Sequence, residues 1–106
     1  MVVYNTTFVV DSWVIEPFKS WVSSTFIPGA LDGGVFIDPL FTRIVPQPAQ
    51  DDDETAESFA VQFKAREMAD ARNWNDTIGA RLIGEIQNRY HDSVLSFSTF
   101  MEIISQ

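Results

Sequence analysis

The sequence predicts an α+β domain in which a four-stranded antiparallel sheet carries two helices on one face. Three observations support this: strand and helix segments follow the order strand–helix–strand twice, each expected helix has one apolar stripe, and one expected strand has a clean apolar face. The 106 residues suit a single domain, residues 1–106, with one core. The expected elements cover residues 2–10, 12–26, 35–45, 57–65, 68–90 and 94–101.

The first expected strand is rich in β-branched and aromatic residues and contains no Gly or Pro, which favours a strand. Because side chains alternate along a strand, Tyr4 and Phe8 would lie on one face, and Asn5 and Thr7 on the other. The strand would therefore have a core side and a more polar side.

The first expected helix follows an N-cap at Asp11 or Ser12. The residues of its buried side recur at helical spacing: Val14, Phe18, Trp21, Val22 and Thr25. Pro17 would remove a backbone hydrogen bond and is expected to kink this helix. The segment Ile27-Pro28-Gly29 is expected to end it.

The second expected strand contains Asp38-Pro39. Proline cannot donate to a strand ladder, so this strand is expected to lie at a sheet edge or to carry a bulge. Residues 46–54 follow with two prolines and four consecutive acids, which indicates a solvated loop. A calcium site is the alternative, but calcium loops alternate their oxygen ligands and use Gly for a sharp turn, and this run does neither.

The third expected strand has the cleanest alternation in the chain. Its two faces would carry Phe59, Val61, Phe63 and Ala65 on the core side and Ser58, Ala60, Gln62 and Lys64 on the other. The second expected helix has one apolar stripe, made of Ala71, Trp74, Ile78, Leu82, Ile86 and Tyr90. On its polar side, Glu85 is spaced for weak surface pairing with Arg81 and with Arg89.

In the last expected strand, Leu95 and Phe97 alternate with Ser96 and Ser98. Right-handed crossovers in both strand–helix–strand units would place the first and third strands at the centre of the sheet. The second strand would then lie at an edge, where Pro39 is tolerated. This arrangement is the ferredoxin-like βαββαβ plait.

The sheet face that the helices leave uncovered is expected to have a mixed character. It would present Asn5, Thr7, Ala60, Gln62, Ser96 and Ser98, with Val3, Val9 and Phe100 nearby. Such a face is too polar for a core and too apolar for full solvation, so we expect a second copy of the chain to cover it. The sequence therefore predicts a homodimer through the open sheet face.

Composition argues against several classes of function. Fifteen acidic against seven basic residues give a net charge of −8, which disfavours nucleic acid and anionic membrane surfaces as partners. Without cysteine there is no disulfide or thiolate site, and the single histidine, His91, cannot form a His-rich metal site. No apolar run approaches the ~20 residues of a membrane span, and the N-terminus lacks a signal-peptide pattern. We expect a cytoplasmic protein with neither metal nor cofactor.

The candidate ligand-binding residues are polar and lie on expected strands: Tyr4, Asn5, Thr7, Arg43, Gln62, Ser96 and Ser98. Arg43 could bind a carboxylate through two hydrogen bonds, or it could protect an edge strand against aggregation. Asn5 and Gln62 could bind a small ligand, or could bond each other or water across a dimer interface. The tryptophans are expected in the core or an interface: Trp13, Trp21 and Trp74.

Several short motifs are spread over nearly the whole chain. They are Tyr4-Asn5-x-Thr7, Trp21 followed by Ile27-Pro28-x-Ala30-Leu31, Gly34-x-Phe36, Arg43, Val61-Gln62-Phe63, Arg89-Tyr90 and Val94-x-x-Phe97-x-Thr99-x-Met101-Glu102. Together they resemble the DUF4286 family of uncharacterised bacterial proteins. The resemblance implies a ferredoxin-like α+β domain of unknown activity and supplies no catalytic residues.

Three functions remain open. A non-catalytic, small-ligand-binding or regulatory homodimer is favoured by the polar sheet face and by the lack of reactive groups. A cofactor-free enzyme of the dimeric α+β barrel type, resembling a monooxygenase or an isomerase, would need a pocket between sheet and helices. That hypothesis loses support if the space is filled by Phe59, Phe63, Trp74 and Phe97. A protein-interaction subunit would use the acidic loop or the exposed residues 100–104.

Overall fold

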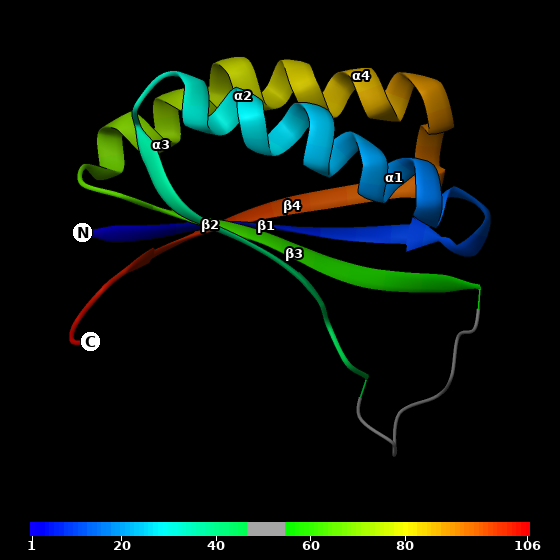
Figure 1. Ribbon diagram of the computed structural model, residues 1–106, viewed down its shortest axis with the longest axis horizontal. Helices are drawn as coiled ribbons and strands as arrows, with labels where there is room; N and C mark the ends of the chain where they lie inside the picture. Colours follow the sequence, from blue (N-terminus) through cyan, green and yellow to red (C-terminus); the bar gives the residue numbers. More distant parts are fainter. Residues whose placement is uncertain (47–54) are drawn as a thin grey trace.

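A computed structural model of the chain describes residues 1–46 and 55–106, so the predicted acidic loop lies outside the described residues apart from Pro46. Figure 1 shows two layers, a twisted sheet and a pair of helical runs that cover one of its faces. The strands are β1 (Val2–Asp11), β2 (Phe36–Arg43), β3 (Ala56–Ala65) and β4 (Val94–Glu102). The predicted α+β class is confirmed.

Each of the two helical runs is a continuous series of α-helices with 3₁₀ and π-turns between or beside them. The first consists of the 3₁₀ turn η1 (Ser12–Val14), α1 (Ile15–Trp21), the π-turn η2 (Val22–Phe26) and α2 (Ile27–Asp32). The second consists of α3 (Met68–Trp74), the π-turn η3 (Asn75–Gly79), α4 (Ala80–Tyr90) and the 3₁₀ turn η4 (His91–Ser93). Among the described residues, no helix is both long and apolar enough to cross a lipid bilayer.

The four strands form one antiparallel sheet in the order β2-β3-β1-β4, which is the predicted plait. β1 lies between β3 and β4 and pairs with β3 from Val2↔Ala65 to Asp11↔Ala56. Buried and half-buried residues alternate along its whole length. This alternation is what a central strand shows when only one of its faces is covered by helices.

β2 is an edge strand, as Pro39 predicted. Its pairing with β3 shifts between Ile37 and Leu40, and Asp38 at this bulge has a φ of 55°. Asp is one of the few residue types that tolerate this left-handed region. The bulge places Pro39 where no ladder hydrogen bond is needed, so its missing N–H costs the sheet nothing.

Both helical runs contain a π-turn directly after a tryptophan, Trp21 in the first run and Trp74 in the second. A π-turn holds one residue more than an α-turn and rotates the residues around it relative to a regular helix. Ile78, predicted on the buried stripe, lies inside η3 and is 37% exposed. The regular spacing that placed it in the core is interrupted by the extra residue.

Hydroxyl groups accompany both π-turns at the same offset. Ser24 Oγ donates to the backbone oxygen of Ser20, and Thr77 Oγ1 donates to that of Asn73, each at 2.7 Å. Such bonds to the carbonyl four residues earlier compete with the helical ladder and bend helices. The two halves of the chain thus carry the same irregularity.

The prediction that Ile27-Pro28-Gly29 ends the first helix is wrong, because α2 continues to Asp32. Pro28 falls at the start of α2, just after the π-turn, where the ladder is already interrupted. Pro17 lies in the first turn of α1, where its missing N–H has no helical partner to lose.

The core lies between the sheet and the helical runs and is largely aromatic. Its buried rings are Tyr4, Phe8, Phe18, Trp21, Phe26, Phe36, Phe59, Phe63 and Trp74. Ring centroids lie 5.3 Å apart for Phe18–Phe59 and 6.3 Å apart for Phe26–Phe63, so the two layers are in direct contact. Trp13 is different: it is 69% exposed and packs edge-on against Tyr90, so of its two predicted positions, core or interface, the core is excluded.

Candidate functional site

The structure separates the seven predicted site residues into three places. Asn5, Thr7 and Gln62 lie on the uncovered face of the sheet; Tyr4, Ser96 and Ser98 face the helices; Arg43 lies at the end of β2. The sequence-predicted set is therefore not one site.

The prediction that Ser96, Ser98 and Phe100 lie on the uncovered face is wrong. The register pairs Ser96 with Phe8 and Ser98 with Thr6, and directly paired residues share a face of the sheet. Phe8 is fully buried, so its partners also face the helices. A one-residue shift of register exchanges the two faces, and nothing within β4 itself sets that register.

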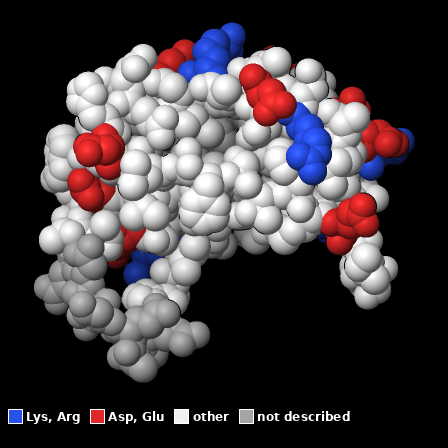
Figure 2. Space-filling model, turned by 180° about the vertical axis from the view of Figure 1, so that it is seen from behind, with Lys and Arg blue, Asp and Glu red and all other residues white. Residues whose placement is uncertain are grey.

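We call the uncovered side of the sheet the open face. Its paired positions are Val3, Asn5, Thr7, Val9, Asp11, Ile37, Leu40, Thr42, Ala56, Ser58, Ala60, Gln62, Lys64, Leu95, Phe97, Thr99 and Met101. The charged residues among these positions are Lys64 and Asp11, and Asp11 stands at the end of β1. Phe97 is 60% exposed and Leu95 52%. Figure 2 shows that the surface is hollowed here, between the end of β2 and the C-terminal residues.

A small polar area lies near the centre of the open face, and we call Asn5, Thr7 and Gln62 the polar patch. Asn5 is the direct cross-strand partner of Gln62. Its side-chain Nδ2 donates to Thr7 Oγ1 over 3.1 Å. All three are half-buried, so they offer neutral donors and acceptors within an apolar surround.

A second group of polar atoms lies between the sheet and the helices. Tyr4 OH donates to Asn75 Oδ1 over 2.7 Å, and Thr6 Oγ1 lies 3.2 Å from Ser98 Oγ. We call these four residues the hydroxyl cluster. Tyr4 and Thr6 are fully buried.

The hydroxyl cluster is uncharged. Burial raises the pKa of the Tyr4 phenol; hydrogen bonds with Thr6 and Ser98 partly oppose the rise, and the nearby carboxylate of Asp76 adds to it. The phenol therefore stays protonated at neutral pH and acts as a hydrogen-bond donor. It could hold a carbonyl or hydroxyl oxygen, but no activated base or nucleophile accompanies it.

Aromatic side chains enclose the hydroxyl cluster. The Tyr4 ring stacks on Phe36 and on Phe100 at 5.2 Å and meets Trp74 edge-on at 5.9 Å. The guanidinium carbon of Arg72 lies 4.6 Å from the centroid of the Phe100 ring. These contacts leave the phenol inside packed side chains rather than at a surface.

Three of the four residues named above as possible fillers, Phe59, Phe63 and Trp74, do fill the space between sheet and helices. The fourth, Phe97, lies on the open face instead, because it pairs with Thr7. This packing weakens the hypothesis of a substrate pocket between the layers.

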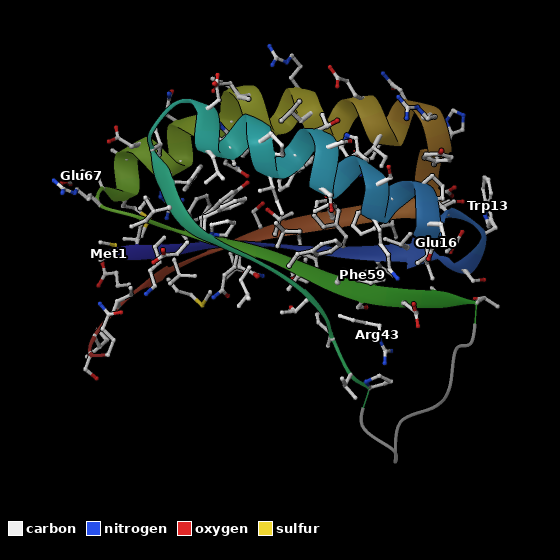
Figure 3. The ribbon with its side chains drawn as sticks, viewed as in Figure 1. Met1, Trp13, Glu16, Arg43, Phe59 and Glu67 are labelled. Atoms are coloured by element: carbon white, nitrogen blue, oxygen red, sulfur yellow. The ribbon has the colours of Figure 1, made fainter. Side chains whose placement is uncertain are left out.

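Arg43 lies at the end of β2, where the register pairs it with Phe59 at the edge of the sheet (Figure 3). Its Nη1 lies 3.4 Å from Glu57 Oε1, and its side chain is 48% exposed. A ligand carboxylate would have to displace Glu57. The position fits the protective role on an edge strand better than a ligand site.

The sequence reasoning missed Thr6 and Asn75. Thr6 had a detectable signal, because it is a polar residue in the otherwise apolar series Tyr4, Thr6, Phe8 and Val10. Asn75 had none, because it enters the site through the π-turn. In the described part of the chain, no group of three or more His, Cys, Asp or Glu residues could hold a metal ion.

Residues 1–104 match the family described as "Domain of unknown function (DUF4286)". None of the curated proteins matches the chain. HapK from Hahella chejuensis is a similar solved structure, with a TM-score of 0.66 and 11% identity, covering 100% of this chain and 95% of that one.

Two further structures are similar. A dimeric ferredoxin-like protein from an uncultured marine organism has a TM-score of 0.63 at 11% identity, covering 100% and 97% of the two chains. A candidate antibiotic biosynthesis monooxygenase from Deinococcus radiodurans has a TM-score of 0.63 at 14% identity, covering 100% and 95%. At these identities the likeness shows a shared ferredoxin-like fold.

Proposed function

This chain belongs to the DUF4286 family, and we propose that it works as a homodimeric, non-catalytic domain that binds a small polar ligand. The open face carries this proposal. It is concave and carries few charges near its centre, and it leaves Leu95 and Phe97 more than half exposed on an acidic chain. Depletion of charge around exposed apolar and aromatic residues is typical of the centre of a protein interface.

The dimensions of the open face support the same assignment. Strands of ten residues such as β1 and β3 are about 33 Å long, and four strands give a width of about 15 to 20 Å. The resulting flat area is about 500 to 650 Å², to which the relief of the side chains adds, compared with the roughly 800 Å² that each partner contributes to a standard interface. A similar structure is described as dimeric, which agrees with this use of the fold.

The polar patch supports the ligand-binding part of the proposal. In a two-fold dimer the same surface of both subunits meets, so two patches would lie within one interface. Covered amide and hydroxyl groups need hydrogen-bond partners. Water would supply these partners to Asn5, Thr7 and Gln62 in the empty dimer, and a small polar ligand would replace that water.

Light scattering after size exclusion tests the dimer directly. At micromolar concentration we expect twice the 12.0 kDa mass of one chain, and a monomer under these conditions would contradict the proposal. A thermal-shift screen with metabolites tests the ligand. Hits should weaken in Gln62→Ala and persist in Arg43→Ala, the matched control outside the polar patch.

A cofactor-free enzyme is the second candidate, and the hydroxyl cluster is the observation that favours it. The Tyr4 phenol could orient a substrate carbonyl, and a candidate monooxygenase shares the fold. The aromatic packing around Tyr4 argues against a pre-formed pocket. The test is whether the protein consumes oxygen or a metabolite found in the screen. Activity that is lost in Tyr4→Phe while the dimer stays intact would favour the enzyme over the binding domain.

A further inference from the structure

A groove of about 250 Å³ lies on the helix layer, away from the open face. One wall comes from the first helical run: Pro17, Ser20, Trp21, Ser24 and Thr25. The other wall comes from Glu85 and Arg89 of α4. The two runs lie over the same face of the sheet (Figure 1), so a dimer formed through the open faces leaves the groove accessible.

The two charged residues of the groove are not paired with each other or with any other described residue. Glu85 and Arg89 were predicted to form a surface pair, as were Arg81 and Glu85, but the ion pairs within residues 1–46 and 55–106 are Lys19–Glu16, Arg43–Glu57 and Lys64–Asp38. One turn of α4 therefore presents an unpaired negative and an unpaired positive charge, about 5 to 6 Å apart at their Cβ atoms. The hydroxyl-bearing residues Ser20, Ser24 and Thr25 line the opposite wall.

The side of the groove formed by Trp21 carries a second observation. Trp21 is 6% exposed, and its indole Nε1 has no hydrogen-bond partner among the described residues, a state that Trp74 Nε1 in the second run shares. A buried N–H without a partner is costly, and a bound molecule that accepts its hydrogen bond would relieve that cost at Trp21, which lines the groove. The neighbouring Ser24 and Thr25 belong to a π-turn, a feature that often marks functional sites.

We propose that this groove binds a small zwitterion of the α-amino-acid class, with its ammonium group on Glu85 and its carboxylate on Arg89. A free anion would be repelled by Glu85 and by the net charge of −8, and a free cation would meet Arg89. A zwitterion satisfies both side chains without a net charge, and its carboxylate suits the guanidinium group. The volume lies below the about 300 to 1,000 Å³ of pockets for drug-sized ligands, which fits a molecule as small as an amino acid.

The groove is a site other than the polar patch, and binding there does not depend on the dimer. The test follows the three tryptophan indole signals of ¹⁵N-labelled protein by NMR, assigned with Trp13→Phe and Trp74→Phe so that Trp21 is identified by elimination. The probes are L-serine, L-threonine, L-alanine and L-glutamine at millimolar concentration. Ethanolamine and 3-hydroxypropanoate, which are L-serine without its carboxylate or its ammonium group, are the matched fragments.

We expect at least one amino acid to shift the Trp21 signal saturably while the exposed Trp13 signal stays in place. Each matched fragment should bind about tenfold more weakly than L-serine, or not at all, since each loses one charge-assisted contact. Glu85→Gln and Arg89→Gln should each weaken the tightest amino acid about tenfold. Arg81→Gln, on the same helix but outside the groove, should bind as the wild type does.

Three results would overturn the inference: no saturable shift of Trp21 with any of the four amino acids, ethanolamine binding as tightly as L-serine, or unchanged affinity in both Glu85→Gln and Arg89→Gln. Light scattering on the same samples reports the dimer separately. A dimer that binds no amino acid would contradict the groove site alone, whereas a monomer that binds one would contradict the interface alone.

Discussion

The sharpest consequence of the proposed interface concerns Phe97. A phenylalanine side chain buries about 200 Å² when fully covered, so a ring that is 60% exposed leaves about 120 Å² for a partner. At about 25 cal/mol per Å², covering this area contributes about 3 kcal/mol to the free energy of association. Phe97→Ala would remove about 2 kcal/mol of it, because the alanine keeps its Cβ and part of the buried area. Two-fold symmetry removes both rings, or about 4 kcal/mol, so the dimer should dissociate about a thousandfold more easily.

Sedimentation equilibrium over a dilution series measures that dissociation constant. Ile78→Ala is the matched control, because Ile78 is also partly exposed, at 37%, but lies on the helix layer. Circular dichroism should show that both variants stay folded. If Phe97→Ala dissociates no more readily than Ile78→Ala, the open face is not the subunit interface.

Three further predictions concern stability, measured by urea unfolding. Tyr4→Phe takes the donor away from Asn75 and should lower the free energy of unfolding by about 1 to 2 kcal/mol; equal stability would mean that the 2.7 Å bond contributes nothing. The pKa of Tyr4 is raised in the folded protein, so the protonated phenol stabilises the fold. This contribution to the free energy of unfolding is complete below the ordinary tyrosine pKa of about 10 and is lost as the pH rises through the pKa of the folded protein. The wild type should therefore lose more stability than Tyr4→Phe between about pH 9 and strongly alkaline solution. Gly79→Ala should lower the free energy of unfolding by about 1 to 3 kcal/mol, because its Cβ would lie 2.8 Å from the Trp74 ring. Gly84→Ala, whose Cβ would meet nothing within 4 Å, should raise it by up to about 1 kcal/mol. If Gly79→Ala were the more stable of the two, the packing around Trp74 would be refuted.

The fold was predictable because its signals are local and agree with one another. The alternation in β3, the helical stripes and Pro39 each point to the same plait, and the strand order confirms it. The π-turns were not predictable in this way. Whether a helix holds an extra residue depends on packing across the layers, which local spacing does not show. Ile78 has the spacing of a core residue in a regular helix, but the π-turn places it outside the core.

The candidate sites were less predictable than the fold, for two physical reasons. Which face a β4 residue occupies depends on its register with β1, and the alternation of serines with apolar residues is compatible with either phase. Asn75 reaches Tyr4 across 71 positions of sequence, and no local pattern indicates such a contact. The polar patch was found because Asn5, Thr7 and Gln62 lie on central strands whose faces the alternation does determine.

The matched π-turns after Trp21 and Trp74 restrict how the length of this chain can change. One additional residue advances a helix by about 1.5 Å and turns its continuation by about 100°. Because both runs carry the insertion at a comparable point, their later turns stay aligned with each other and with the sheet. Deleting the extra residue from either run would rotate its later side chains relative to the sheet and to the other run. Insertions and deletions in homologous chains should therefore avoid the two helical runs.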